Sequence, residues 1–268
     1  IYPLTHLRAG KQPGKDALGR FYTMRHQIDL VRRSDAVIVQ TPSERAFYTQ
    51  RGVDPDQVHV VGPGCNPKQI IGGNGDQFRE RHGLKHPIVA MLGKMSYDKG
   101  STHTVQAMQK LWAQGEQVHL VAAGDMMAPV RSYLQNLPAK VKDRILLLGP
   151  VSEDEKKDML AAADMLVMPS RTDSFGIVYL EAWLYGKPVI GARAWGIGDV
   201  IAEGTDGLLV PFGDVSKLAQ AIRYLLRHPL EAAAMGKRGK EKVLAQHTWD
   251  QKYPTIHQLY TTLARASK

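Results

Sequence analysis

Short runs of apolar residues alternate with longer amphipathic segments along most of this chain, and this alternation constrains the fold more than any other feature. Most of the runs are four to six residues long and stop at glycine or proline, as in 88–92 before Gly93 and 118–123 before Gly124. Strands buried on both faces have such continuous apolar sequences, and alternation with helices of ten or more residues indicates βαβ units. The sequence therefore predicts an α/β fold with a doubly wound parallel sheet between two helical layers.

The alternation also predicts how the chain is divided. Residues 87–248 hold the regular pattern and are expected to form a complete C-terminal domain. Residues 1–66 hold only two or three apolar runs, too few for an independent domain of this class, so we expect them to be part of an N-terminal domain. Residues 67–86 begin with a Gly-rich polar stretch and are expected to be an interdomain linker, and 249–268 to be a C-terminal helix.

Composition excludes several classes of protein. With 43% hydrophobic and 23% charged residues, the chain is globular and not disordered. The single cysteine, Cys65, excludes internal disulfides and Cys-based structural zinc, and suits a reducing, cytoplasmic compartment. The net charge of +9 suits an anionic partner: a nucleotide, a phosphate, an acidic lipid headgroup or a nucleic acid. Peripheral contact with an anionic membrane surface, at the inner face of the membrane, is one such case, and a solvated basic surface would give the same charge.

Two lysines follow the first strand of the predicted C-terminal domain. Lys94 and Lys99 are five residues apart in a loop that enters a helix, where they can straddle a diphosphate. Free N–H groups and the partial positive charge of the helix N-terminus add to such a site. In open parallel sheets, ligands lie beyond the carboxyl ends of the strands, which is where this loop falls. A solvated lysine pair is the alternative.

The segment 169–182 is the densest in chemically useful groups. Asp173 is expected in a loop, and Glu181, eight residues later, two turns into a helix over 175–185. Gly176 exposes backbone N–H groups that can bind phosphate or sugar hydroxyls. Glu181 stands among apolar residues, where a charged group needs a partner, and a ribose diol would serve. A helix-dipole Asp and an exposed Glu are the alternative interpretation.

These residues resemble a known family. The Asp173…Glu181 pair with an intervening Phe-Gly is similar to the E-x7-E signature of the retaining GT-B glycosyltransferases of family 4, the glycosyl transferases group 1. Further motifs follow in the family's order: Gly93-Lys94…Lys99-Gly100, Leu148-Gly149-Pro150-Val151, Ala163-Asp164…Pro169-Ser170, Gly186-Lys187-Pro188 and Asp206-Gly207. The resemblance covers about residues 35–265 and implies two Rossmann-like domains, the first of them partial and on the acceptor side.

The resemblance implies a hexosyltransferase that uses a nucleotide-diphospho-sugar donor. Lys94 and Lys99, after Gly93, would hold the diphosphate, and Glu181 would bind the ribose. Asp173 would contact the donor sugar. The backbone would complete the donor site, through Ser174, Phe175, Gly176 and Ile177 at the sugar and Gly149 and Val151 at the nucleobase. No cofactor or metal would be required, because two lysines can replace a cation.

The resemblance extends to both ends of the chain. His6 would face the donor sugar as a further catalytic group. The C-terminal helix would cross back to the N-terminal domain, anchored by Trp249, Tyr253 and Tyr260. The acceptor would be an unidentified hydroxyl of a sugar, a sugar phosphate or a lipid-linked sugar.

Some positions depart from the family's pattern, and other functions remain as alternatives. Asp173 is one methylene shorter than the usual Glu, Lys94 replaces an Arg, and the segment 194–201 around Trp195 matches only loosely. A GT-B epimerase, a sugar phosphorylase and a nucleotide-sugar-binding fragment without turnover are the rivals. No nucleic-acid partner is expected, because the basic residues lack aromatic interleaving.

Overall fold

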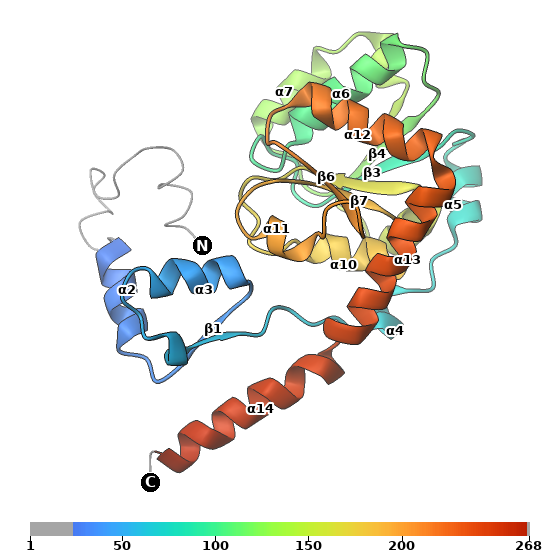
Figure 1. Cartoon of the computed structure of the whole chain (residues 1–268). Coiled ribbons are helices and arrows are strands. Elements are labelled where there is room, and N and C mark those ends of the chain that lie inside the picture. Colours follow the sequence, from blue (N-terminus) through green and yellow to red (C-terminus); the bar gives the residue numbers. More distant parts are fainter. Residues whose placement is uncertain (1–23, 267–268) are drawn as a thin grey trace. The chain divides into compact units, whose positions relative to one another are not determined.

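The computed structural model describes residues 24–266, and the chain divides into two compact units (Figure 1). The first unit comprises residues 1–64 and 249–268, and the second comprises residues 65–248. Each unit has a hydrophobic core of its own, and the core of the second is much the larger.

The second unit is built on a six-stranded sheet in which every neighbouring pair of strands is parallel. The strands are β3 (Ile88–Leu92), β4 (His119–Ala123), β5 (Ile145–Gly149), β6 (Met165–Met168), β7 (Val189–Ala192) and β8 (Gly207–Val210). Their order is β5-β4-β3-β6-β7-β8, so the direction of winding reverses between β3 and β6. The predicted doubly wound parallel sheet is confirmed, and every residue of the central strand β3 is buried, as its apolar sequence requires.

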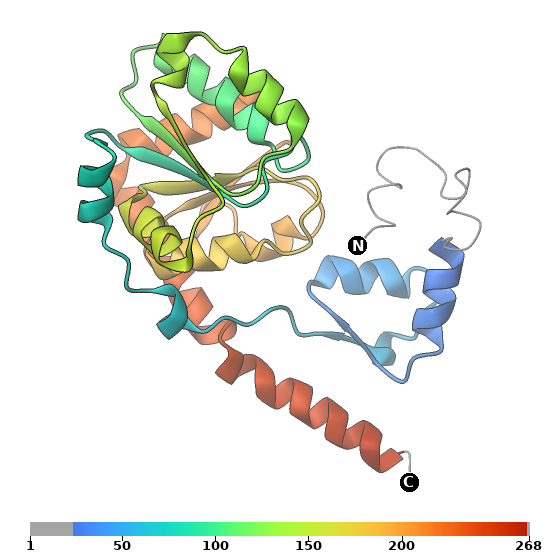
Figure 2. The same ribbon diagram turned by 180° about the vertical axis from the view of Figure 1, so that it is seen from behind.

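Helices cover both faces of this sheet. They are α4 (Pro67–Ile70), α5 (Gly75–Arg81), α6 (Ser101–Ala113), α7 (Ala128–Gln135), α8 (Ala139–Lys142), α9 (Glu153–Ala162), α10 (Ile177–Leu184), α11 (Ile197–Val200), α12 (Val215–Arg227) and α13 (Pro229–Gln246). Figures 1 and 2 show α6, α7 and α12 on one side of the sheet and α10 on the other. Helix α12 packs on α6, and α13 packs on α10.

Helix α9 begins where the sequence predicts it. The side chain of Ser152 accepts a hydrogen bond from the backbone N–H of Glu155, and three acidic residues occupy the first turn. A cap of this kind contributes about 1 kcal/mol, and the acidic turn adds a favourable interaction with the helix dipole. The predicted start at Ser152 is therefore confirmed, and it fixes where the side chains of α9 face the rest of the unit.

The segment 67–86 differs from the predicted linker. It contains α4 and α5, and the Phe78 side chain of α5 is fully buried in the core of the second unit. Arg79 on the same helix donates to the carbonyl of Ala162 and pairs with Asp164 at 2.7 Å. This part of the chain is held by packing because Phe78 and Leu84 are buried in the core.

The first unit, as far as the structure describes it, has a two-stranded parallel sheet of β1 (Val37–Val39) and β2 (Val58–Val60). Its helices are α2 (Met24–Arg32), α3 (Pro42–Thr49), the 3-10 turn η1 (Pro55–Gln57) and the C-terminal α14 (Trp249–Ala266). The three aromatic residues of α14 that were expected to anchor it, Trp249, Tyr253 and Tyr260, are all more than half exposed. Within residues 24–266, no helix has the length and apolar character needed to cross a membrane.

Candidate functional site

The candidate site lies at the carboxyl ends of β3 and β6, the two strands between which the winding reverses. The loop after β3 runs from Gly93 to Gly100, and the loop after β6 runs from Pro169 to Gly176. A crevice at such a point is the common ligand site of doubly wound sheets. The structure therefore brings together two segments that the sequence singled out, although they are about 75 residues apart in the chain.

An ion pair links these two loops. Lys99 Nζ contacts Asp173 Oδ1, and both side chains are largely shielded, with exposed fractions of 27% and 18%. The Lys99 N–H donates to Ser96 Oγ at 3.3 Å, and the Ser96 N–H donates to Ser101 Oγ at 3.1 Å, so the loop around the lysine is tightly folded. Lys94, at the start of the loop, is exposed and forms no ion pair with another described residue.

The start of α10 depends on Gly176. Its φ of 80° lies in the left-handed region, and a Cβ there would overlap the ring of Tyr179. The helix therefore begins at Ile177, two residues later than predicted, and no side chain caps it. Ser174 and Phe175 are buried beside this turn, while Ile177 is 52% exposed. The backbone at the start of α10 is thus close to solvent and can receive a ligand.

The Tyr179 side chain packs against the turn at Gly176. It is fully buried, and its hydroxyl donates to the carbonyl of Met168 at 2.6 Å. Burial, with the charge of Asp173 adding to it, raises the pKa of Tyr179 well above 10, so the phenol stays protonated and keeps donating. The hydroxyl thereby ties α10 to the end of β6, which keeps the Asp173 loop close to the sheet.

Glu181 has a partner that the sequence did not identify. Its carboxylate is 12% exposed and accepts from Lys156 Nζ of α9 at 2.9 Å, and Lys156 also pairs with Glu153 at 2.8 Å. Burial acts to lower the pKa of Lys156, but the hydrogen bonds and charges of the two carboxylates outweigh it, so the pKa is raised and the ammonium is retained. From the sequence, one could predict only that a buried carboxylate such as Glu181 needs a partner, and not which residue it is.

The carboxyl end of β5 completes this edge of the sheet. Gly149 has a φ of 68°, and its carbonyl accepts from the Gly124 N–H at 2.7 Å, which joins the ends of β4 and β5. Val151 is half-buried against the core, directly before the cap of α9. Backbone groups at Gly149 and Val151 thus stand one strand away from the loop of Lys99, because only β4 separates β5 from β3.

Cys65 lies close enough to Glu181 for their charges to interact. The thiol is buried, and burial together with the charge of Glu181 raises its pKa. Its backbone N–H donates to the carbonyl of His247 at 2.8 Å, and the His247 ring meets the Phe175 ring at 5.4 Å between centroids. A raised pKa disfavours the thiolate, which is the nucleophilic form of cysteine.

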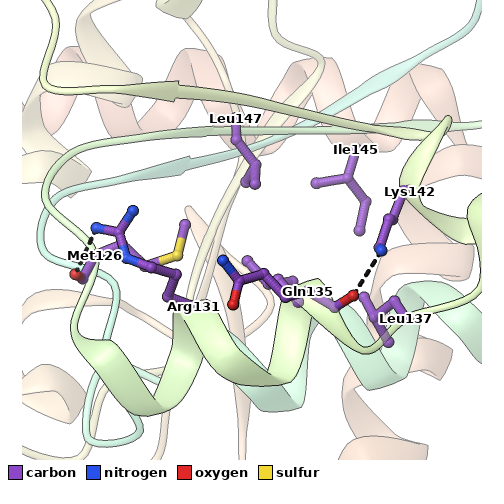
Figure 3. A pocket seen from close by; sticks show the side chains of 8 residues that line it. Met126, Arg131, Gln135, Leu137, Lys142, Ile145 and Leu147 are labelled. Atoms are coloured by element: carbon purple, nitrogen blue, oxygen red, sulfur yellow. Dashed lines mark hydrogen bonds between the residues drawn. The ribbon is translucent and has the colours of Figure 1, made fainter.

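A separate pocket of about 350 Å³ lies against the edge strand β5 (Figure 3). Its lining residues come from α7, α8 and β5 and the turns beside them: Met126, Arg131, Leu134, Gln135, Leu137, Lys142, Ile145 and Leu147. The Lys142 ammonium donates to the carbonyl of Gln135 at 2.6 Å. None of the predicted site residues lines this pocket, so it is distinct from the candidate site.

His6 lies outside the described residues. Within residues 24–266, no three His, Cys, Asp or Glu side chains are arranged to hold a metal ion.

Comparison with known proteins gives a consistent result. The family model described as "Glycosyl transferases group 1" matches residues 75–242, more than half of the chain. A D-inositol 3-phosphate glycosyltransferase of Xylanimonas cellulosilytica is 30% identical over 250 residues, which cover 89% of this chain and 59% of that protein. A GDP-mannose-dependent monoacylated alpha-(1-6)-phosphatidylinositol monomannoside mannosyltransferase of Corynebacterium glutamicum is 32% identical over 171 residues, covering 61% and 44%.

Solved structures agree with the fold. Sucrose-phosphate synthase from Thermosynechococcus elongatus superposes with a TM-score of 0.81 at 27% identity, covering 98% of this chain and 66% of that chain. HepE from Anabaena, in complex with UDP and glucose, superposes with a TM-score of 0.78 at 22% identity, covering 89% and 66%. The chain spans about half the length of the curated relatives it matches.

Proposed function

The chain belongs to the glycosyl transferases group 1 family, and from this premise we propose that it transfers a hexosyl group from a nucleotide-diphospho-sugar to an acceptor hydroxyl, with retention at the anomeric carbon. The observation that carries the proposal is the Lys99–Asp173 ion pair at the point where the winding of the sheet reverses. It places a cation suited to a diphosphate beside a carboxylate suited to sugar hydroxyls.

Lys99 changes partner in this proposal. Without donor it is paired with Asp173, and a diphosphate, which carries more than one negative charge, competes for the ammonium. Asp173 is then free to accept hydrogen bonds from the hydroxyls of the donor sugar, beside the backbone of Ser174, Phe175, Gly176 and Ile177. Lys94 is exposed and adds a second cation to the diphosphate.

The nucleoside half of the donor lies beside the diphosphate, along the carboxyl edge of the sheet. One oxygen of Glu181 is held by Lys156, and the second oxygen makes no hydrogen bond to another described residue and is available to the ribose diol. The backbone of Gly149 and Val151 meets the nucleobase. The complexes of HepE with UDP and UDP-glucose support a nucleotide-sugar as ligand.

The chemistry follows from where charge develops. The bond between the anomeric carbon and the β-phosphate oxygen breaks, and the electron pair leaves with the nucleoside diphosphate. The acceptor oxygen bonds to the same face of the anomeric carbon, and its proton passes to the departing phosphate oxygen. Because negative charge grows on the phosphate, Lys94 and Lys99 stabilise the transition state more than the bound donor.

The names of two relatives bear on the acceptor. The names of the Corynebacterium and Xylanimonas relatives indicate a phosphatidylinositol mannoside and an inositol phosphate as acceptors of those proteins. These names support the hydroxyl of a phosphorylated polyol, comparable to a sugar phosphate, or of a lipid-linked sugar for this chain. His6 is proposed to face the donor sugar.

The donor can be identified by a thermal-shift panel of UDP, GDP, ADP and their sugars. Selective stabilisation by one nucleoside diphosphate and its sugar is expected, and a ligand present at 100 times its Kd contributes about 2.7 kcal/mol. Incubation with the radiolabelled sugar nucleotide then separates two outcomes. Transfer or hydrolysis supports an enzyme, binding with neither supports a donor-binding module, and no stabilisation by any nucleotide contradicts both.

A further inference from the structure

A second ion pair joins the same two loops as Lys99 and Asp173. Arg171 Nε donates to Asp98 Oδ1 at 2.8 Å, and Arg171 Nη2 lies 2.7 Å from the same oxygen. Asp98 directly precedes Lys99, and Arg171 precedes Asp173 by two residues. Neither residue has a role in the proposed donor site.

The backbone around this ion pair is also joined. The Arg171 N–H donates to the carbonyl oxygen of Asp98 at 2.9 Å, and the hydroxyl of Ser170 donates to the same oxygen at 3.3 Å. A Cβ at Gly100 would lie 2.6 Å from the carbonyl oxygen of Pro169, so the two loops approach as closely as glycine allows. The loops are therefore in direct contact on both sides of Lys99.

Two aromatic rings pack against the guanidinium, one from the loop after β3 and one from a third loop. Arg171 lies 5.3 Å from the ring centroid of Tyr97 and 5.0 Å from that of Phe212, which follows β8. The buried ring of His103 meets each of these rings edge-on, at 4.9 Å between centroids. Cations at such distances from ring faces are attracted to them, so the rings restrict where the guanidinium can move.

We propose that Asp98 and Arg171 form a clamp that positions Lys99 and Asp173 for the donor. The inference rests on the proposed function, in which the donor's diphosphate draws Lys99 away from Asp173. That exchange opens one of the two ion pairs that join these loops in the described part of the chain. The Asp98–Arg171 pair then remains, and it holds the ammonium and the carboxylate at the separation that a diphosphate and its sugar require.

The direction in which Asp98→Asn changes the affinity for a diphosphate distinguishes positioning from simple electrostatics. Asp98→Asn removes a negative charge next to Lys99, so charge alone would strengthen the binding of a diphosphate. The clamp predicts the opposite, because the lysine loses its fixed place, and small displacements of a binding group are costly. Asp98→Asn is therefore expected to weaken the best nucleoside diphosphate of the panel about 10-fold, with the matching nucleoside affected less than 2-fold.

Four further variants complete the experiment, with affinities measured by calorimetry or competition. Arg171→Met should weaken the diphosphate similarly, and the double variant Asp98→Asn/Arg171→Met no more than either single change, since they remove one interaction. Arg171→Lys should recover part of the loss. Arg227→Met, which removes an arginine from the ion pair with Glu116 at the other end of the sheet, is the matched control and should leave both affinities unchanged.

Hydrogen exchange gives a reading that needs no ligand. In Asp98→Asn the loops 94–100 and 169–176 should lose protection together, while the segment 139–149 should not change. The inference is wrong if diphosphate affinity is unchanged or rises, if nucleoside and diphosphate weaken equally, or if only one loop loses protection. If the wild-type protein binds no nucleoside diphosphate, the proposed function is refuted. The hydrogen-exchange result still tests whether Asp98 and Arg171 hold the two loops together.

Discussion

Lys156 contacts two carboxylates at nearly the same distance, and the structure predicts that these two contacts differ several-fold in energy. Its ammonium is 2.9 Å from Glu181 and 2.8 Å from Glu153. The Glu181 side chain is 12% exposed and the Glu153 side chain 75% exposed. Distance alone would make the two interactions equal, so the difference isolates the effect of solvent.

The magnitudes follow from Coulomb's law. At about 2.9 Å and an effective dielectric constant of about 20, two charges attract by about 6 kcal/mol, whereas in water the figure is about 1.5 kcal/mol. Water that still reaches the site and the hydrogen bond that glutamine retains reduce the first figure. We expect a coupling free energy of about 2–3 kcal/mol between Lys156 and Glu181, and below about 0.5 kcal/mol between Lys156 and Glu153.

Two double-mutant cycles measure these couplings. One combines Lys156→Met with Glu181→Gln, and the other combines Lys156→Met with Glu153→Gln. Urea unfolding at pH 7 is followed by tryptophan fluorescence, because Trp183 is fully buried in the core of the second unit. The cycles remove the desolvation cost of each single charge, which would otherwise obscure the comparison.

Salt provides the internal control. In 1 M NaCl, where the Debye length is about 3 Å, the coupling to Glu153 should vanish and most of the coupling to Glu181 should remain. Equal couplings in the two cycles, or equal salt dependence, would refute the argument that burial sets the strength of this pair. Lys156 would then have no special relation to Glu181, and its place in the proposed ribose site would be lost.

Other substitutions test the rest of the site. Lys99→Met should weaken a nucleoside diphosphate about 10-fold or more and the bare nucleoside hardly at all, and equal losses by calorimetry would contradict a phosphate role. Burial lowers the pKa of His103 below 6.5, so as pH falls through 6.5 the unfolded chain binds a proton that the folded chain does not, and stability falls. His103→Leu should remove that loss between pH 7.5 and 5.5 in urea unfolding, and an unchanged slope would refute it. Gly124→Ala should cost about 3 kcal/mol or more, since φ is 127° and a Cβ would overlap the carbonyl of Gly93. Gly115→Ala, at φ 86° with open space around it, should cost only about 1 kcal/mol.

The sheet could be predicted from the sequence because strands buried on both faces have continuous apolar sequences. Five buried apolar residues at 88–92 can form little other than an inner strand, and a serine followed by three acids marks the start of α9. The loops after β3 and β6 could likewise be placed, since the carboxyl ends of parallel strands share one edge. These inferences needed only neighbours in the chain.

The partner of Glu181 could not be predicted in the same way. Lys156 is 25 residues away and reaches Glu181 only because α9 and α10 lie on the sheet in a particular rotation and register. Several lysines in the sequence were equally suitable. The packing of segment 67–86 was not predicted for a related reason: its buried residues, Phe78 and Leu84, form no periodic pattern in the sequence.

The two carboxylates of the signature are both neutralised without donor, but by lysines that differ in what a ligand does to them. Lys99 neutralises Asp173 and is itself a proposed phosphate ligand, so donor binding must redistribute that pair. Lys156 neutralises Glu181, whose proposed partner, a ribose diol, carries no charge and cannot displace an ammonium. If these proposed roles are correct, the ribose end of the site is fixed before the donor arrives and the diphosphate end rearranges. The loops around Lys99 then need a support such as Asp98–Arg171 that the donor leaves intact.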